Sequence, residues 1–316
     1  MSGCYAVFHK QLGDLLLLEP ALSRLQAHHG GSVSVLTRSG HAPLLQLMEG
    51  VQWQKGTPLR PHRHLYCFDP LNKSALRSLF APVARRHCLL PDAHESAWFH
   101  RFLFGDVVVP GLGNRYVAEY FWSLLPVSAN GAFRPPRLTP PPDSWRPQNL
   151  GDEPFLLLNP TSGWRQKNWQ PDRWAEVIKA LAALGTPGCL ITSASADWQV
   201  AHCRAIENLA GPLIHNLGTA TTLENFLWLT ANARLVLTVD GAASHLAAAF
   251  GVPNLTLFGP THRANWHYPT STSHALQAAT DRDGKARLRN LPTAEVIRAA
   301  EKLWSHRDDR RNQSAV

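Results

Sequence analysis

The stretch from residue 235 to residue 261, LVLTVDGAASHLAAAFGVPNLTLFGPT, limits the possible folds of this chain more than any other. Its first five residues are mostly apolar and β-branched, which is typical of a parallel strand buried on both faces. A polar interruption follows, and then a short helix is predicted at 245–250 with Ser244 as its N-cap. Gly251 and Pro253 end this helix, and residues 254–258 have the pattern of a second buried strand. The stretch therefore predicts a compact strand–helix–strand unit.

Asp240 stands where the first of these strands ends and the helix approaches its start. In open α/β sheets, ligands bind beyond the carboxyl ends of the strands, and the free amides of a helix start attract phosphate groups. His245 could donate a hydrogen bond to a phosphate or a sugar hydroxyl, or only to a backbone group. The alternative for the whole stretch is a tight crossover that binds no ligand.

The rest of the chain predicts two parallel α/β halves joined by a stiff, proline-rich linker. In the first half we expect strands at 4–8, 32–37, 64–68 and 87–90, and helices at 41–48, 74–84 and 114–125. In the second half we expect strands at 155–159, 188–192, 213–217, 235–239 and 254–258, and helices from Pro171 to Gly185, at 197–209, 222–232 and 293–304. Thr221 and Glu224 fit a capping box for the helix at 222–232.

These elements predict the α/β fold class, with two Rossmann-like parallel-sheet domains and a cleft between two facing sheets. The expected division is an N-terminal domain at 1–140, a linker at 141–154, a C-terminal domain at 155–292, a final helix at 293–305 and a frayed tail at 306–316.

Asp14 is the most notable carboxylate of the first half. It follows the first predicted strand and lies at or just before the start of a helix that contains four consecutive leucines. Pro20 either kinks one long helix at this place or begins a second helical segment. A carboxylate in this position could serve as a general base for a hydroxyl nucleophile. The alternative is an ordinary aspartate at a helix N-terminus.

The loop that follows Asn159 carries the second group of candidate residues. It reads PTSGWRQKNW and lies between a predicted strand and a predicted helix. Thr161 and Ser162 supply hydroxyl donors and Lys167 supplies a positive charge, which together could hold a diphosphate. The P-loop signature is absent, and the alternative is a solvated loop without a ligand.

Charge and cysteine content narrow the function classes. The chain has 316 residues, a formal net charge of +8 and a pI of about 9.5, which favours an anionic partner. The basic residues are scattered, so we expect no nucleic-acid partner. The five cysteines form no C-x-x-C pair, which indicates reduced core thiols and gives no support for a zinc site. No apolar run reaches the length of a membrane span, so any membrane contact would be peripheral.

Three blocks of sequence and their spacing resemble glycosyltransferase family 9, the ADP-heptose:lipopolysaccharide heptosyltransferases. LGDLLLLEPALSRL resembles the family's Gly-Asp motif and the apolar helix with an internal proline that follows it. NPTSGWRQKNWQPDRWAEV resembles its phosphate loop, and TTLENFLWLTANARLVLTVDGAASHLAAAFGVPNLTLFGPT resembles its nucleotide-sugar motif. Within the family, Pro-Thr-Ser-Gly-Trp combined with Phe-Gly-Pro-Thr and Trp266 is most similar to the side-branch type, heptosyltransferase III.

The resemblance implies a two-domain GT-B fold and inverting transfer of a heptose from ADP-heptose to the lipopolysaccharide inner core. It implies action at the cytoplasmic face of the inner membrane, an anionic core acceptor on the N-terminal domain, and no cofactor or obligatory metal. By position, Asp14 matches the family's general base. The positions that match the donor diphosphate and sugar site are Thr161, Ser162, Lys167, Asp240, Gly241, Ala242 and His245, and those near the adenine are Thr221 and Thr222.

One departure from the family pattern affects the donor site. The family usually has Asp-Ser/Thr-Gly where this chain has Asp240, Gly241 and Ala242. The missing hydroxyl leaves the identity of the donor open, including another nucleotide sugar. Two further alternatives are a nucleotide-sugar epimerase or hydrolase on the same fold, and a nucleotide-binding or RNA-binding protein without enzymatic activity.

Overall fold

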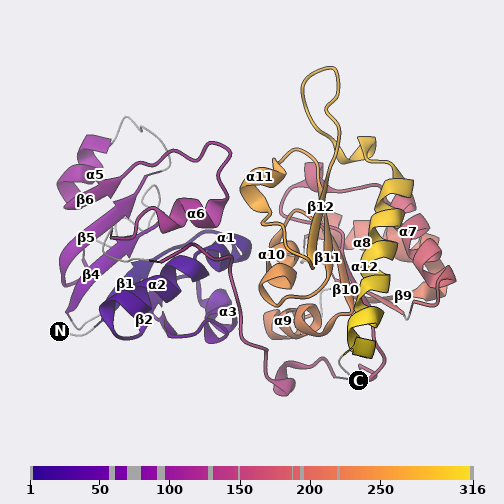
Figure 1. Cartoon of the computed structure of the whole chain (residues 1–316), viewed down its shortest axis with the longest axis horizontal. Coiled ribbons are helices and arrows are strands. Elements are labelled where there is room, and N and C mark those ends of the chain that lie inside the picture. Colours follow the sequence, from indigo (N-terminus) through magenta and orange to yellow (C-terminus); the bar gives the residue numbers. More distant parts are fainter. Residues whose placement is uncertain are drawn as a thin grey trace. The chain divides into compact units, whose positions relative to one another are not determined.

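The structure is a computed structural model of the chain. It describes residues 3–56, 61–69, 80–90, 97–126, 131–148, 150–186, 188–192, 196–218 and 221–313. The chain divides into two compact units, Met1–Thr139 and Pro140–Val316, which we call the N-terminal and the C-terminal unit (Figure 1).

The N-terminal unit is built on a six-stranded, all-parallel sheet in the order β3-β2-β1-β4-β5-β6. Its strands are β1 (Cys4–Val7), β2 (Val33–Leu36), β3 (Val51–Gln54), β4 (His62–Cys67), β5 (Val83–Leu89) and β6 (Asp106–Val108). Its helices are α1 (Leu12–Leu17), α2 (Glu19–His29), α3 (Ala42–Gln46), α5 (Ala97–Leu103) and α6 (Val117–Trp122).

One expected helix of this unit needs correction, and three of its elements, β3, α5 and β6, were not predicted. The helix expected at 74–84 falls largely outside the described residues, and its last two residues are the start of strand β5. Strand β3 was not predicted, because its sequence VQWQ has one partly exposed valine and lies at the sheet edge, where apolar runs are not required.

The C-terminal unit repeats the same architecture with the order β12-β11-β10-β7-β8-β9, again all parallel. Its strands are β7 (Leu156–Asn159), β8 (Cys189–Thr192), β9 (Ile214–Gly218), β10 (Leu235–Val239), β11 (Asn254–Phe258) and β12 (Ser273–Gln277). Its helices are α7 (Pro171–Ala183), α8 (Asp197–Ala210), α9 (Leu223–Asn232), α10 (Ala242–Ala249), α11 (Arg263–Trp266) and α12 (Thr293–Gln313).

Strand β10 confirms the prediction of a strand buried on both faces. Leu235 and Leu237 pack into a core cluster with side chains of α7, α8 and α12, whereas Val236 packs into a second cluster with side chains of α9 and α10. Successive residues of a strand point to opposite faces, so a continuous apolar run is what a doubly covered strand needs. This burial fixes the place where β10 ends and hence the position of Asp240.

The helix α12 is longer than its sequence pattern suggests. Its apolar face ends near Trp304, and residues 306–316 were expected to be a frayed tail. The backbone is nevertheless helical to Gln313. Neither proline nor glycine occurs between 305 and 313, so no residue there stops the helix, although its apolar periodicity has ended.

The proline at position 20 begins a second helix rather than kinking a single one. Helix α1 ends at Leu17, and Pro20 lies in the first turn of α2. Proline is tolerated in a first turn because its missing N–H would have no partner within the helix. Glu19, which is buried at the start of α2, forms a bidentate ion pair with Arg134 at 2.6 and 2.7 Å. This pair ties the beginning of the proline-rich segment to the N-terminal unit.

All five cysteines are free and buried, as the sequence indicated for reduced core thiols. Burial raises the pKa of the Cys4, Cys88 and Cys189 thiols well above the usual range. These thiols are therefore protonated and unreactive at neutral pH.

A group of histidines lies on one face of the N-terminal sheet beside the end of α2. His64 Nδ1 is 3.0 Å from His87 Nε2, His87 Nδ1 is 3.0 Å from an Asp106 carboxylate oxygen, and His29 Nε2 is 3.0 Å from the Tyr66 hydroxyl. Burial lowers the pKa of His29 to about 4, and further contributions come from His64, His28, His87 and Arg63. The His29 imidazole is thus poorly able to accept a proton.

This lowered pKa predicts a loss of stability in acid. Between pH 6.5 and 4 the unfolded chain binds a proton at His29 that the folded chain does not, so stability falls as the pH falls through this window. We expect His29 to account for about 1 kcal/mol of the loss between pH 7 and pH 5, allowing for solvent screening of a partly exposed group. Urea unfolding of the wild type and of His29→Gln at both pH values measures this difference. An equal loss in both proteins would contradict the assignment.

Candidate functional site

The candidate donor site lies at the topological switch point of the C-terminal sheet. The chain runs outward from β7 to β9 and then returns to place β10 on the other side of β7. Ligands of doubly wound sheets bind beyond the carboxyl ends of the two strands that flank such a point. The loop after Asn159 and the segment after Val239 are the two connections that begin there. These are the two segments that the sequence singled out.

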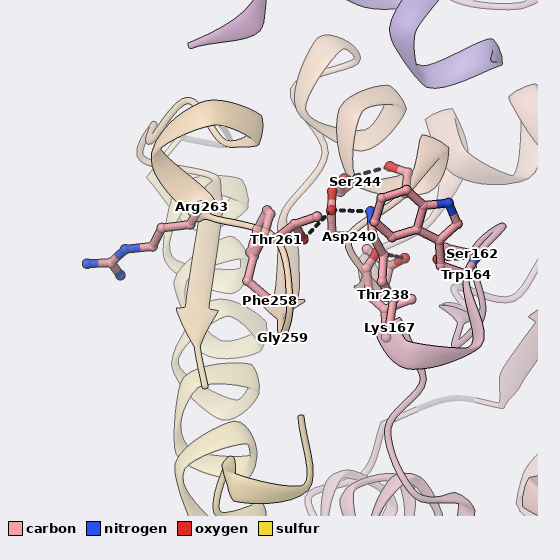
Figure 2. Close-up of polar contacts among 12 residues, drawn as sticks. Ser162, Trp164, Lys167, Thr238, Asp240, Ser244, Phe258, Gly259, Thr261 and Arg263 are labelled. Atoms are coloured by element: carbon pink, nitrogen blue, oxygen red, sulfur yellow. Dashed lines mark hydrogen bonds and ion pairs between the residues drawn. The ribbon is translucent and has the colours of Figure 1, made fainter. Parts of the chain in front are cut away.

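Lys167 and Asp240 form a buried ion pair at this place. Lys167 Nζ lies 2.6 Å from Asp240 Oδ2, and the two side chains are only 15% and 3% exposed. The same carboxylate oxygen accepts a hydrogen bond from the Thr261 hydroxyl at 2.6 Å. Figure 2 shows Asp240 between Lys167 on one side and Thr261 on the other. The structure therefore joins two residues that lie 73 positions apart in the chain.

The loop after β7 presents Lys167 through a short 3-10 turn at Arg165–Lys167. The indole of Trp164, which is 60% exposed, lies beside the lysine with its ring centroid 4.9 Å from Nζ. Thr161 is buried, and its hydroxyl accepts a hydrogen bond from the amide of Gln199 at 3.2 Å. The same amide donates to the Ser162 carbonyl at 2.9 Å. Gln199 thus holds the start of the loop from helix α8.

Helix α10 begins earlier than the sequence suggested. It starts at Ala242, with Gly241 as its N-cap, and not at residue 245. The prediction of Ser244 as the N-cap is wrong, because its hydroxyl lies inside the first turn and donates to the Gly241 carbonyl at 2.7 Å. The earlier start places the free amides of the first turn directly after Asp240. This arrangement favours an anion next to the ion pair.

Gly241 is favoured by the limited space around it and not by its backbone conformation. Its φ of 179° is extended backbone that any residue can adopt. A Cβ atom at this position would, however, lie 3.3 Å from the Cβ of Ser162. Ser162 therefore occupies the room that a side chain at 241 would need, and the two loops of the site are in close contact.

The remaining predicted donor-site residues lie on the helix starts. His245 is 7% exposed on α10, with its ring centroid 6.3 Å from that of Trp266. Thr221 and Thr222 precede α9, which follows the sheet-edge strand β9. The capping box is shifted by one residue from the prediction, because Thr222 Oγ1 accepts the amide of Asn225 at 3.1 Å. Among the described residues, neither threonine forms a hydrogen bond with Lys167 or Asp240.

Asp14 lies at the corresponding switch point of the N-terminal sheet, between β1 and β4. It is the third residue of α1, slightly further into the helix than predicted. Its carboxylate accepts a hydrogen bond from the main-chain N–H of Gln11 at 3.4 Å. Arg38, which follows β2, donates to the His9 carbonyl at 2.9 Å and thereby holds the loop that leads into α1. Asp14 is partly exposed, beyond the carboxyl end of the central strand β1.

Comparison with known families decides the identity of the chain. A family model described as glycosyltransferase family 9 (heptosyltransferase) matches residues 138–295, which is half of the chain. The chain belongs to glycosyltransferase family 9. The matched part contains both loops of the candidate site and the ion pair, and the chain is accordingly a glycosyltransferase.

Individual relatives extend the family 9 likeness over nearly the whole chain. The lipopolysaccharide heptosyltransferase 3 of Escherichia coli is 26% identical over 92% of this chain and 96% of its own length. Among solved structures, E. coli ADP-heptose lps heptosyltransferase II has a TM-score of 0.80 at 19% identity and covers 98% of this chain and 100% of its own. E. coli heptosyltransferase WaaC with ADP has a TM-score of 0.76 at 18% identity, with 95% and 99% covered. These likenesses confirm the GT-B fold predicted for this family 9 member.

Three residues that lie around this candidate site were not predicted from the sequence. Thr261 was noticed only as part of Phe-Gly-Pro-Thr, although it contacts Asp240 directly. Gln199 is the third residue of the amphipathic helix α8 and gives no local signal. Gln277 ends strand β12, and its amide contacts the loop that carries Thr261.

The described part of the chain contains neither a cluster of metal ligands nor a membrane-spanning helix. Within it, no set of three or more histidine, cysteine or acidic side chains is arranged to hold a metal ion. None of its helices combines the length and the apolar character that crossing a bilayer would require.

Proposed function

We propose that this family 9 enzyme transfers a heptose from ADP-heptose to an anionic sugar of the lipopolysaccharide inner core, with inversion at the anomeric carbon. The names of its relatives support the donor and the acceptor class, because they are lipopolysaccharide heptosyltransferases and one solved relative was determined with ADP. The enzyme would work as a peripheral protein at the cytoplasmic face of the inner membrane, where such a lipid-linked acceptor is available.

The observation that carries the donor assignment is the Lys167–Asp240 pair at the switch point, with Nζ and Oδ2 2.6 Å apart. An ammonium group has three N–H donors, and Asp240 uses one of them. The others can serve the oxygens of a diphosphate, together with the Ser162 hydroxyl and the first amides of α10. Such preorganised donors stabilise the negative charge that develops on the departing ADP.

Ser162 offers a physical reason for the unusual Gly241. A side chain at 241 would crowd Ser162, whose Cβ would lie 3.3 Å from the added Cβ and would have to shift by a few tenths of an ångström. We propose that Ser162 supplies from the first loop the hydroxyl that the family pattern usually supplies from the second. The donor contact would then be preserved, although the sequence motif is changed.

The acceptor side is assigned to the N-terminal unit. Asp14 would take the proton of the acceptor hydroxyl as its oxygen attacks the anomeric carbon. The new C–O bond forms as the bond to the diphosphate breaks, and ADP leaves with the electron pair. Two exposed cations lie on this side of the unit: Lys10 is close to Asp14 in the chain, and Arg38 follows strand β2, which pairs with β1. Their positive charges suit an acceptor with phosphate or carboxylate groups.

A thermal-shift comparison tests the proposed donor. ADP-heptose and ADP should raise the melting temperature, and by more than ADP-glucose or UDP-glucose, since a ligand stabilises the state that it binds. At a ligand concentration of about 100 Kd, the expected stabilisation is about 2.7 kcal/mol. A preference for the uridine nucleotide would overturn the donor assignment.

Incubation with ADP-heptose alone separates transfer from the alternatives on the same fold. A transferase should consume the donor slowly until a lipopolysaccharide core acceptor is added, whereas a hydrolase or epimerase should consume it at full rate without acceptor. Fast consumption without acceptor would contradict the proposal.

A further inference from the structure

Thr261 shares the carboxylate oxygen that pairs with the proposed diphosphate-binding lysine. Asp240 Oδ2 accepts from Thr261 Oγ1 and from Lys167 Nζ, each at 2.6 Å, and the Asp240 side chain is 3% exposed. The threonine comes from the loop after β11, the strand that lies next to β10 on the side opposite β7. The three residues of this contact, Lys167, Asp240 and Thr261, therefore follow the three adjacent strands β7, β10 and β11.

The shared oxygen gives Thr261 influence over Lys167. In a buried setting, a carboxylate with one donor pulls strongly on that donor, and a second donor on the same oxygen reduces this pull. The hydroxyl also fixes the rotamer of Asp240 and with it the direction of the ammonium group. Both effects leave more of the lysine charge, in a fixed position, for a phosphate oxygen.

The loop that carries Thr261 is itself held in place from the neighbouring strand β12. The amide nitrogen of Gln277 lies 3.3, 3.0 and 3.3 Å from the carbonyl oxygens of Phe258, Gly259 and Thr261. The side-chain oxygen of Gln277 accepts a hydrogen bond from the main-chain N–H of Arg263 at 3.0 Å. A Cβ at Gly259 would lie 3.0 Å from Leu288, so the backbone there is tightly packed as well. The position of the Thr261 hydroxyl is thus set by the fold.

We propose that Thr261 is a positioning residue that acts through Asp240 to keep Lys167 available to the donor diphosphate. The inference rests on the proposed function, in which Lys167 binds that diphosphate. It predicts an effect specific to the diphosphate: ligands with this group should depend on the hydroxyl, and adenosine should not.

The experiment measures binding of ADP and of adenosine by calorimetry. Thr261→Val removes the hydroxyl at nearly constant shape and should raise the Kd for ADP about tenfold, as expected for a hydrogen bond to a charged group. Thr261→Ser keeps the hydroxyl and should remain within about threefold of the wild type. The Kd for adenosine should be unchanged in both variants.

The matched control is Thr256→Val on strand β11, the strand that leads into the loop with Thr261. Thr256 is completely buried, and among the described residues its hydroxyl has no hydrogen-bond partner. The same chemical change there should leave ADP binding unchanged. If Thr261→Val does not fold, Thr261→Ala tests the same hydrogen bond.

The possible outcomes separate this inference from the proposed function. An ADP affinity that is unchanged in Thr261→Val but reduced in Lys167→Met would overturn the role of Thr261 and keep the donor site. An equal loss of ADP and adenosine binding would show a general loosening of the loop and would also overturn it. A wild-type protein that does not bind ADP, or binds it independently of Lys167, would instead overturn the proposed donor site.

Discussion

Replacement of Asp14 by asparagine is expected to lower kcat at least about a hundredfold, the lower range for loss of a general base. The amide keeps the size of the side chain but cannot take the proton of the acceptor hydroxyl. ADP binding and the melting temperature should remain close to those of the wild type, because the change concerns only the N-terminal unit and a partly exposed side chain. Initial rates with ADP-heptose and a lipopolysaccharide core acceptor measure the effect.

Asp143→Asn provides the control for this variant. Asp143 is an exposed aspartate in a short 3-10 turn of the C-terminal unit, so the same chemical change should leave turnover unaltered. Near-normal turnover of Asp14→Asn would remove Asp14 from the role of base. A large loss of ADP affinity in this variant would point to a structural effect and would equally count against it.

Lys167→Met should affect both binding and stability. Truncating one partner of a buried charge pair between a protein and its ligand costs about 2–5 kcal/mol in binding. Because Lys167 would pair with the diphosphate, we expect the Kd for ADP to rise about 30-fold or more. The substitution also leaves the Asp240 carboxylate buried without its cation, which should lower the free energy of unfolding by about 3 kcal/mol. Calorimetry and urea unfolding measure the two quantities separately.

A double variant distinguishes these two effects. Lys167→Met combined with Asp240→Asn removes both charges, so most of the lost stability should return while ADP affinity stays low. The non-additivity of the two substitutions measures the coupling within the ion pair. Recovery of wild-type ADP binding in the double variant would show that the lysine charge is not what holds the diphosphate.

Much of the C-terminal unit could be predicted because its central strands are buried on both faces. The run Leu235–Val239 is apolar for this reason, and it places Asp240 at the carboxyl end of a strand. The loop with Lys167 follows another such strand. Each segment could therefore be recognised as a candidate without knowledge of the other.

The pairing of these segments could not be predicted, because it depends on strand order. Lys167 meets Asp240 only since β10 lies beside β7, and the intervening chain contains two further strands. Ser244 shows a different limit: its type favours an N-cap, but Gly241 already ends the preceding loop and the hydroxyl turns back to that carbonyl. Local preference identified the segment of α10 and misplaced its start by three residues.

The identical winding of the two sheets has a consequence for how new acceptor specificities can arise. Every strand connection is completed within one unit, and the chain passes from one unit to the other only once, at Thr139 and Pro140. A recombination event at that single crossing would exchange the whole unit for which we propose acceptor binding, without cutting either sheet. If the two units have the roles proposed above, chimeras joined there would combine the nucleotide-sugar unit of this chain with the acceptor range of another enzyme.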